Sequence, residues 1–355
     1  MGHKWVGLRW ERLLRLQNLS AARFKLDRVT IYVHRGLSVK IVLIVLAVVV
    51  GLVLAVEVGL RLLFGFGNPL IYIADEQIGY LLAPNQRTRR FGNLIEINQY
   101  SMRSPKITET RPESTLRVLL LGDSIANGGW WTDQAETLSA MMTQQLQSSI
   151  DGKTFKQIEV LNASANSWCP RNELAYLKQF GTFDAQVVVL LINTDDLFGT
   201  APTSIPVGRD RNYPDQKPPL ALVEAFSRYL LKAPPVPEMK AVNAESGDRV
   251  GLNLKAIQEI QTIAEQKGAR FLLAMTPLKR ELGEPGSRDY ELKARVRLID
   301  LTQNQHIAYI DFLPIFNSKE QPENLYRDHI HLSPQGNQLV NEEIGRSLSQ
   351  LKMQN

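Results

Sequence analysis

The sequence predicts a three-layer α/β/α domain with a five-stranded parallel sheet, preceded by a single transmembrane helix. From residue 116 onward, short apolar runs alternate with amphipathic stretches, which is the pattern of β–α units joined by right-handed crossovers. One apolar segment of bilayer length lies near the N-terminus. The 355 residues are 44% hydrophobic and 22% charged, which is ordinary for a chain with a sizeable core.

Positive charge is concentrated at the N-terminus. The formal net charge is +5, but residues 1–40 hold nine Lys or Arg and two acidic residues, whereas the rest of the chain holds 32 basic and 34 acidic residues. The positive net charge therefore comes from the N-terminal segment and does not indicate a nucleic-acid-binding domain. The single cysteine, Cys169, excludes an intramolecular disulfide.

An unbroken apolar run from Ile41 to Val56 continues to Phe66 with only two charged residues. We expect a transmembrane helix over residues 41–66, because the extended run reaches the length of a bilayer core. A buried core helix is the alternative, but such helices rarely lack polar residues all round. A cleaved signal peptide would need a shorter basic region and a small-residue cleavage site. Because the basic block precedes the span, residues 1–40 are expected to be a cytoplasmic tail, and the rest periplasmic or extracellular.

Residues 67–115 predict a connecting region. Prolines punctuate it, and short β-like pieces lie between them at residues 70–73 and 94–97. We expect a small extended subregion packed on the main domain, which we place at residues 116–355.

Five strands and four helices are expected within residues 116–355. The apolar runs that predict strands are Leu116–Leu121, Ile158–Leu161, Val187–Ile192, Phe271–Met275 and Ile307–Phe312. The stretches that predict helices are Leu138–Leu146, Asn172–Phe180, Leu254–Lys267 and the segment from Ser333 to Leu351. Gly181 and Gly268 follow two of these helices where a glycine is favoured, and Ser333-Pro334 is typical of a helix N-terminus.

A proline-rich insertion at residues 197–247 interrupts this alternation. It contains eight prolines and one short helix-like piece, Leu220–Leu231. An irregular insertion of this length is usually a substrate-side lid or a disordered loop. It follows the third strand, so it is expected to begin beside any site at the carboxyl ends of the strands.

A serine stands at the carboxyl end of the first strand, where open α/β sheets keep their sites. Gly122 permits a tight turn there, and Asp123-Ser124 follows it. A serine hydroxyl is a weak nucleophile that needs a base, and the base needs an orienting group. His329 and His331 follow the fifth strand at the same end of the sheet. Asp328 lies three residues before His331, a spacing at which a turn brings a carboxylate and an imidazole together.

These motifs carry a family resemblance. From about Leu116 to the C-terminus the chain resembles the SGNH/GDSL hydrolases, which implies a flavodoxin-like arrangement of the sheet. Residues 122–125 (Gly-Asp-Ser-Ile) resemble the first block of that family and imply that Ser124 is the nucleophile. Residues 328–333 (Asp-His-Ile-His-Leu-Ser) resemble the last block and imply that His331 is the base and Asp328 its partner.

The middle blocks depart from the family pattern. The resemblance implies oxyanion donors from the N–H of Ser124, an N–H after the second strand and an asparagine side chain after the third. Ser167 stands at the family's glycine position, and Asp195 stands where the family has asparagine. An ionised carboxylate would repel a developing oxyanion. Either Asp195 is protonated, or Asn193 or Asn166 supplies the donor, or activity is reduced.

Three tryptophans near these blocks, Trp130, Trp131 and Trp168, are expected to form an aromatic wall for a sugar ring. Core packing is the alternative for at least one of them. Cys169 is interpreted as a buried thiol, because the histidine and the aspartate are already assigned to a serine. Neither a Cys/His cluster with metal-ligand spacing nor a glycine-rich phosphate loop is present, so no metal or cofactor is expected.

The resemblance implies a membrane-anchored extracytoplasmic serine esterase. Its expected substrate is an O-acetyl or other acyl ester on an envelope polysaccharide or another carbohydrate, and its expected partner is membrane lipid around residues 41–66. Acyl transfer by the same triad to a sugar hydroxyl is the enzymatic alternative. A non-catalytic envelope binding or assembly module with the same fold is the alternative of another class. Asp195 and Ser167 favour that module, whereas the joint presence of Ser124, Asp328 and His331 opposes it.

Overall fold

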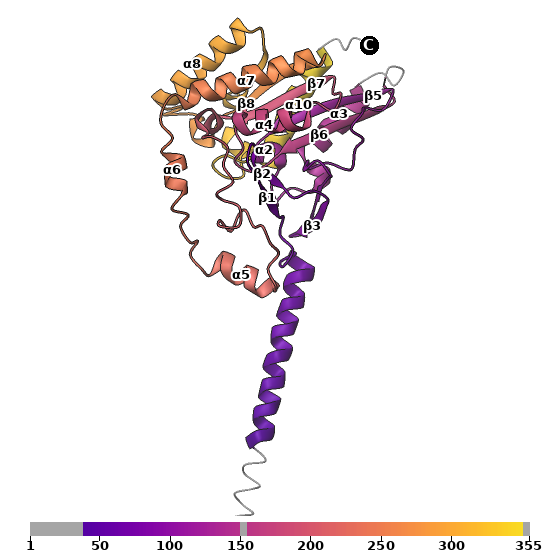
Figure 1. Cartoon of the computed structure of the whole chain (residues 1–355), viewed down its shortest axis with the longest axis vertical. Helices are drawn as coiled ribbons and strands as arrows, with labels where there is room; N and C mark the ends of the chain where they lie inside the picture. Colours follow the sequence, from indigo (N-terminus) through magenta and orange to yellow (C-terminus); the bar gives the residue numbers. More distant parts are fainter. Residues whose placement is uncertain (1–37, 150–154, 351–355) are drawn as a thin grey trace, which may run out of the picture. The chain divides into compact units, whose positions relative to one another are not determined.

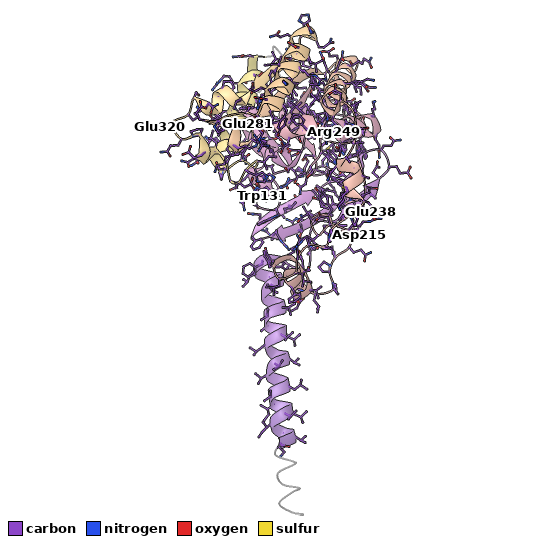
Figure 2. All side chains as sticks on the ribbon, turned by 90° about the vertical axis from the view of Figure 1, so that its left-hand side faces the viewer. Trp131, Asp215, Glu238, Arg249, Glu281 and Glu320 are labelled. Carbon is purple, nitrogen blue, oxygen red and sulfur yellow. The ribbon has the colours of Figure 1, made fainter. Side chains whose placement is uncertain are left out.

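The computed structural model describes residues 38–149 and 155–350, which fall into two compact units that divide at Gly59–Leu60. A helix of 27 residues, Ser38–Phe64, runs through this division. Its most apolar window has a mean hydropathy of 3.2, and none of that window is buried. Side chains project from it all round in Figure 2. By length and composition this helix can cross a membrane. The predicted basic tail lies outside the described residues, apart from residues 38–40.

The second unit is built on a five-stranded parallel sheet with the order β6-β5-β7-β8-β9. The strands are β5 (Thr115–Gly122), β6 (Gln157–Ser164), β7 (Val187–Asn193), β8 (Arg270–Thr276) and β9 (Ala308–Asp311). The chain therefore starts in the interior of the sheet, moves once to one side and then continues on the other. This is a flavodoxin-like doubly wound order, and it places a crevice at the carboxyl ends of β5 and β7. The predicted α/β fold with five parallel strands is confirmed.

Helices cover both faces of the sheet (Figure 1). The side chains of Leu116, Val118 and Leu120 pack with one helical layer, and those of Leu119 and Leu121 pack with the other. The first layer contains α3 (Leu138–Ser149), α9 (Phe312–Asn317) and α10 (Pro334–Gln350). The second contains α4 (Pro170–Phe180), α7 (Arg249–Gln266) and α8 (Asp289–Asn304). Because β5 is buried on both faces, its residues from Val118 to Leu121 are all apolar and show no alternation. The buried Arg117 of the same strand pairs with Glu159 of β6 at 2.7 Å.

The helix ends follow local signals. Gly181 and Gly268 adopt φ values of +76° and +75°, in the left-handed region where glycine carries no steric penalty. The hydroxyl of Ser333 accepts a hydrogen bond from the N–H of Gly336 at 3.2 Å at the start of α10. Helix α7 begins earlier than expected, because Asp248 caps it by accepting from the N–H of Gly251 at 2.9 Å. Helix α8 was not among the helices predicted from the sequence.

Residues 67–115 contain two antiparallel hairpins. They are formed by β1 (Tyr72–Asp75) with β2 (Gly79–Leu82) and by β3 (Gln86–Arg90) with β4 (Asn93–Ile97). Tyr80, Leu82 and Ile97 are buried in the same apolar core as Leu119 of the central sheet. These hairpins therefore add to the core of the second unit.

The proline-rich insertion holds two helices, α5 (Ala221–Tyr229) and α6 (Met239–Asn243). Ion pairs join it to other segments: Glu224 to Arg90 at 2.6 Å and Glu245 to Arg171 at 2.9 Å. The remaining short elements are α2 (Ser124–Asn127) and four 3₁₀ turns at Gln134–Glu136, Thr194–Phe198, Lys279–Glu281 and Pro322–Leu325.

A fully buried arginine organises the loop after α2. The guanidinium of Arg103 donates hydrogen bonds to the carbonyl oxygens of Asn127, Gly129 and Thr132. Desolvation lowers the pKa of Arg103 to about 10, so the group still carries its charge at neutral pH. Three carbonyls from one loop therefore depend on one cation for their hydrogen bonds.

We expect Arg103→Met to destabilise the second unit by about 3 kcal/mol, because it leaves buried carbonyl oxygens without donors. The measurement is thermal unfolding of the full chain in detergent, followed by circular dichroism. Arg87→Met is the matched control, because the side chain of Arg87 is 69% exposed and its ion pair with Glu96 contributes little. Equal effects of the two substitutions would contradict this account of Arg103.

Candidate active site

The nucleophile turn is positioned by a close approach of two strands. A Cβ atom on Gly122 would lie 2.7 Å from the carbonyl oxygen of Leu191 in β7 and 2.8 Å from the Cβ of Ala126 in α2. Only glycine fits between these atoms. The chain then turns directly into α2, which begins with Ser124. As the first residue of a helix, Ser124 has an N–H with no acceptor inside the helix.

Ser124, His331 and Asp328 lie in one hydrogen-bonded chain. The Nε2 atom of His331 is 3.0 Å from Oγ of Ser124, and its Nδ1 atom is 2.8 Å from Oδ2 of Asp328. The other carboxylate oxygen of Asp328 accepts from the backbone N–H groups of Ile330 at 3.0 Å and His331 at 2.8 Å. The Asp-x-x-His spacing thus closes a turn, and the turn directs the imidazole toward a serine 207 residues away in sequence.

The electrostatics of Asp328 fix the tautomer of the histidine. Partial burial raises the pKa of Asp328, but donation from the N–H groups of Ile330 and His331 and from the imidazole outweighs it and lowers that pKa to about 2. The ionised carboxylate can only accept, so Nδ1 of His331 carries the proton. The lone pair of Nε2 then points at the hydroxyl of Ser124, which is the arrangement that general-base activation of a serine requires.

A cleft of about 930 Å³ contains the triad, and the three expected tryptophans line it. The ring of Trp131, labelled in Figure 2, meets the imidazole of His331 edge-on with centroids 4.6 Å apart. Trp130 is 43% exposed and contacts Phe91 of the β3–β4 hairpin. Trp168 is only 1% exposed, so most of its ring belongs to the core and it borders the cleft only marginally.

Ser167 has the backbone conformation that its position in the family pattern requires. Its φ is +59°, in the left-handed region that favours glycine and costs other residues about 1–2 kcal/mol. The hydroxyl of Ser167 accepts a hydrogen bond from Tyr213 of the proline-rich insertion at 2.9 Å. Tyr80 donates to the carbonyl oxygen of the preceding residue, Asn166, at 2.6 Å. Two tyrosines thus hold the loop after β6 in this conformation.

Asn193 does not fit the role of substitute oxyanion donor. Its amide nitrogen donates to Oδ2 of Asp123 at 2.8 Å and to Oδ2 of Asp196 at 2.9 Å, so both of its protons are already committed. Burial raises the pKa of Asp123 and of Asp196, and an amide between them relieves part of the repulsion. The sequence analysis did not single out Asp196. The available signal was the Asn-x-x-Asp spacing of a capping box at the start of Thr194–Phe198.

Asn166 is the better of the two asparagine candidates. It lines the cleft together with Ser124 and Ser167. Its Oδ1 atom is buried without a hydrogen-bond partner, and its amide nitrogen makes no hydrogen bond within residues 38–149 and 155–350. An uncommitted amide at the wall of the cleft is free to donate to a bound oxygen.

Asp195 lines the same cleft and is an exposed residue. Partial desolvation raises the pKa of Asp195 above the usual aspartate value, although Arg280 acts in the opposite direction. This direction favours the protonated form, which can donate a hydrogen bond. Cys169, by contrast, is buried, and desolvation raises its thiol pKa to about 12, which excludes a thiolate nucleophile at neutral pH.

The hydrogen-bonded chain of Ser124, His331 and Asp328 has the geometry that a serine hydrolase site requires. The family model described as "GDSL-like Lipase/Acylhydrolase family" matches residues 120–339, more than half of the chain. The protein therefore belongs to this family and is an ester hydrolase of the SGNH/GDSL type. A comparison with curated proteins gave no match.

Among solved structures, the acetyl xylan esterase AlAXEase is 15% identical, with a TM-score of 0.44 over 66% of this chain and 100% of that one. An acetylxylan esterase from Geobacillus stearothermophilus is 13% identical, with a TM-score of 0.45 over 66% of this chain and 94% of that one. A lipase/acylhydrolase from Enterococcus faecalis is 14% identical, with a TM-score of 0.41 over 66% of this chain and 96% of that one.

We expect Asp328→Asn to lower kcat by about 10³- to 10⁴-fold, because an amide no longer holds the required tautomer of His331. The loss should be the same from mildly acidic to alkaline pH, since Asp328 stays ionised down to about pH 2. The hydrogen bonds that Asp328 accepts stabilise the folded state at every pH above the ordinary aspartate pKa. This contribution to the free energy of unfolding is lost only as the pH falls toward 2. The measurement is kcat for hydrolysis of p-nitrophenyl acetate by the native chain and by Asp328→Asn at a series of pH values. A loss that vanished at alkaline pH would contradict it.

Asp195→Asn is expected to raise kcat/KM about 10- to 100-fold at alkaline pH, because it replaces a carboxylate by a permanent donor. The advantage should shrink as pH falls, since the raised pKa of Asp195 returns a proton to the native side chain earlier than in an ordinary aspartate. The control is Asp195→Ala, which removes the charge but supplies no donor. A pH-independent ratio, or a slower Asn variant, would contradict a role of Asp195 at the oxyanion position.

Proposed function

We propose that this protein is a membrane-anchored serine esterase in which Ser124 attacks an acyl ester. His331 acts as general base and then general acid, and Asp328 orients it. The observation that carries this proposal is the uninterrupted hydrogen-bonded chain from Asp328 through His331 to Ser124 at the wall of an open cleft.

The reaction follows from this geometry. The hydroxyl oxygen of Ser124 adds to the ester carbonyl while Nε2 of His331 takes its proton. The N–H groups of Ser124 and Ser167 receive the developing oxyanion, with Asn166 or protonated Asp195 as a side-chain donor. Collapse breaks the bond to the leaving alcohol, which takes the proton from His331. Water then adds to the acyl-enzyme with the same base and releases the acid and free Ser124.

The substrate that suits this cleft best is a small acyl group, such as acetyl, on a carbohydrate. A volume of about 930 Å³ is large for a simple ester and leaves room for sugar rings around the reacting carbonyl. Trp131 presents its ring beside His331, and Trp130 extends the aromatic surface outward. A single N-terminal span with a basic cytoplasmic flank would place this site outside the cytoplasm, near an envelope polysaccharide.

Acyl transfer to a sugar hydroxyl is the second candidate, because a further pocket adjoins the cleft. That pocket has a volume of about 590 Å³ and is lined in part by Ser167, Cys169, Gly199 and Tyr213, which also line the cleft. An acceptor bound there would approach the acyl-enzyme from the side of the oxyanion loop. The same triad would activate its hydroxyl in place of water.

We expect the full chain in detergent to hydrolyse p-nitrophenyl acetate and to react with a fluorophosphonate probe. Ser124→Ala should abolish probe labelling and lower hydrolysis at least about 10³-fold, because the nucleophile is missing. Ser318→Ala, an exposed serine outside the cleft, is the control and should change neither. Labelling that survived in Ser124→Ala would overturn the assignment of the nucleophile.

The same preparation separates hydrolysis from transfer. With an O-acetylated xylo-oligosaccharide as donor and a non-acetylated glycoside as acceptor, a hydrolase releases acetate, whereas a transferase makes acetylated glycoside. If neither the native chain nor Asp195→Asn acts on any ester while both remain folded, the catalytic proposal is wrong and a binding module is left.

A further inference from the structure

Helix α5 (Ala221–Tyr229) carries an apolar face that the described residues of the second unit leave exposed. Val223 and Phe226 within the helix, and Leu220 and Leu230 at its two caps, recur at intervals of three or four residues and are between 46% and 72% exposed. Residues at this spacing lie on one side of a helix. An exposed apolar stripe of this kind on a soluble surface marks an interaction site.

The opposite face of α5 is fixed to the protein by polar contacts. Glu224 is buried and accepts from Arg90 at 2.6 Å, from Arg228 at 2.8 Å and from the backbone N–H of Gly67 at 2.7 Å. The helix is therefore held with its polar side inward and its apolar side outward. This is the reverse of what a solvated surface helix requires, so the outward face needs an apolar environment.

The neighbours of α5 indicate what that environment is. The end of the apolar helix Ser38–Phe64 and the residues after it belong to the same compact unit as α5. Arg61 donates to the carbonyl oxygen of Pro219 at 3.2 Å, just before α5, and the ring of Phe66 meets that of Tyr229 with centroids 6.0 Å apart. If Ser38–Phe64 crosses a membrane, α5 is tied to the point at which the chain leaves it.

Charge agrees with a lipid surface. Lys217 and Lys232 stand on either side of the apolar stripe, and both are exposed. Basic residues that flank an apolar helical face are the pattern of helices lying in the headgroup region, where lysines meet anionic lipids. A second exposed apolar stripe lies on α8 and consists of Leu292, Val296 and Ile299. The contacts that join α5 to Arg61 and Phe66 do not involve α8. In Figure 1, α8 lies at the far end of the second unit from α5.

We infer that the apolar face of α5 inserts into the headgroup boundary of the membrane and seats the active-site cleft at the lipid surface. Arg228 and Tyr229 of α5 line the cleft that holds Ser124. One helix thus borders the lipid with one face and the cleft with another. This inference rests on the proposed membrane span and esterase function, and it narrows the substrate to esters carried by a membrane-held amphiphile.

The position of α5 can be measured on the full chain reconstituted in vesicles of phosphatidylethanolamine and phosphatidylglycerol. An environment-sensitive fluorophore is attached to Phe226→Cys or, as the matched exposed apolar control, to Val296→Cys. Native Cys169 is buried with its thiol pKa raised to about 12, so it should stay unlabelled, and the unsubstituted chain checks this. The probe on residue 226 should emit at shorter wavelength and be quenched by lipids with a nitroxide near the headgroup. The probe on residue 296 should show neither effect.

Two results would overturn the inference. One is a probe on residue 226 that is as exposed to water as the control. The other is a blue shift that depends on protein concentration and is insensitive to lipid quenchers, because a second copy or another protein would then cover α5.

Activity separates this inference from the proposed function. The Phe226→Asp, Leu230→Asp variant should lose about 10-fold or more on an O-acetylated long-chain alkyl glycoside held in vesicles, and keep its activity on soluble p-nitrophenyl acetate. The matched Leu292→Asp, Val296→Asp variant on α8 should keep both activities. If the α5 variant keeps both activities, the substrate inference is wrong. If hydrolysis of p-nitrophenyl acetate does not depend on Ser124, the proposed function fails whatever α5 does.

Discussion

The hydrogen bonds of Asn193 connect the ends of β5 and β7 next to Ser124. Its amide donates to Asp123, which also caps α2 by accepting from the N–H of Ile125 at 2.8 Å, and to Asp196 in the 3₁₀ turn after β7. The direction in which α2 leaves the sheet, and hence the position of Ser124, depends on this amide. Two buried carboxyl groups are costly alone, and the shared amide offsets part of that cost.

The same interaction changes the interpretation of the oxyanion site. An asparagine whose protons are both committed to buried carboxyl groups is a structural link between strands and is not free to stabilise a substrate. In the proposed mechanism the side-chain donor would then be Asn166, in the loop after β6, or Asp195 in its protonated form. Both options lie at the wall of the cleft, and they differ in their dependence on pH. Whether the aspartate at position 195 can replace the family's asparagine as a donor thus depends on whether its carboxyl group is protonated.

Segments outside the family core build the surroundings of the triad. The hairpins before β5 supply Tyr80, which holds the loop of Asn166, and Phe91, which supports Trp130. The insertion after β7 supplies Tyr213, which holds Ser167, and α5, which borders the cleft. The family core therefore carries Ser124, Asp328 and His331, whereas these additional segments form part of the walls of the cleft.

The sequence alone determined the five strands and most of the helices, and it predicted the three residues that the structure brings into one hydrogen-bonded chain. These features are encoded locally: an apolar run of strand length, a glycine or serine at a helix end, an aspartate three residues before a histidine. Helix α8 was not predicted from the sequence, because some of its apolar residues lie in the core and others are exposed to solvent. Only the tertiary structure decided which asparagine is committed, which tryptophan meets His331 and where the apolar face of α5 points. Each of these depends on distances between residues far apart in the chain, which a local pattern does not contain.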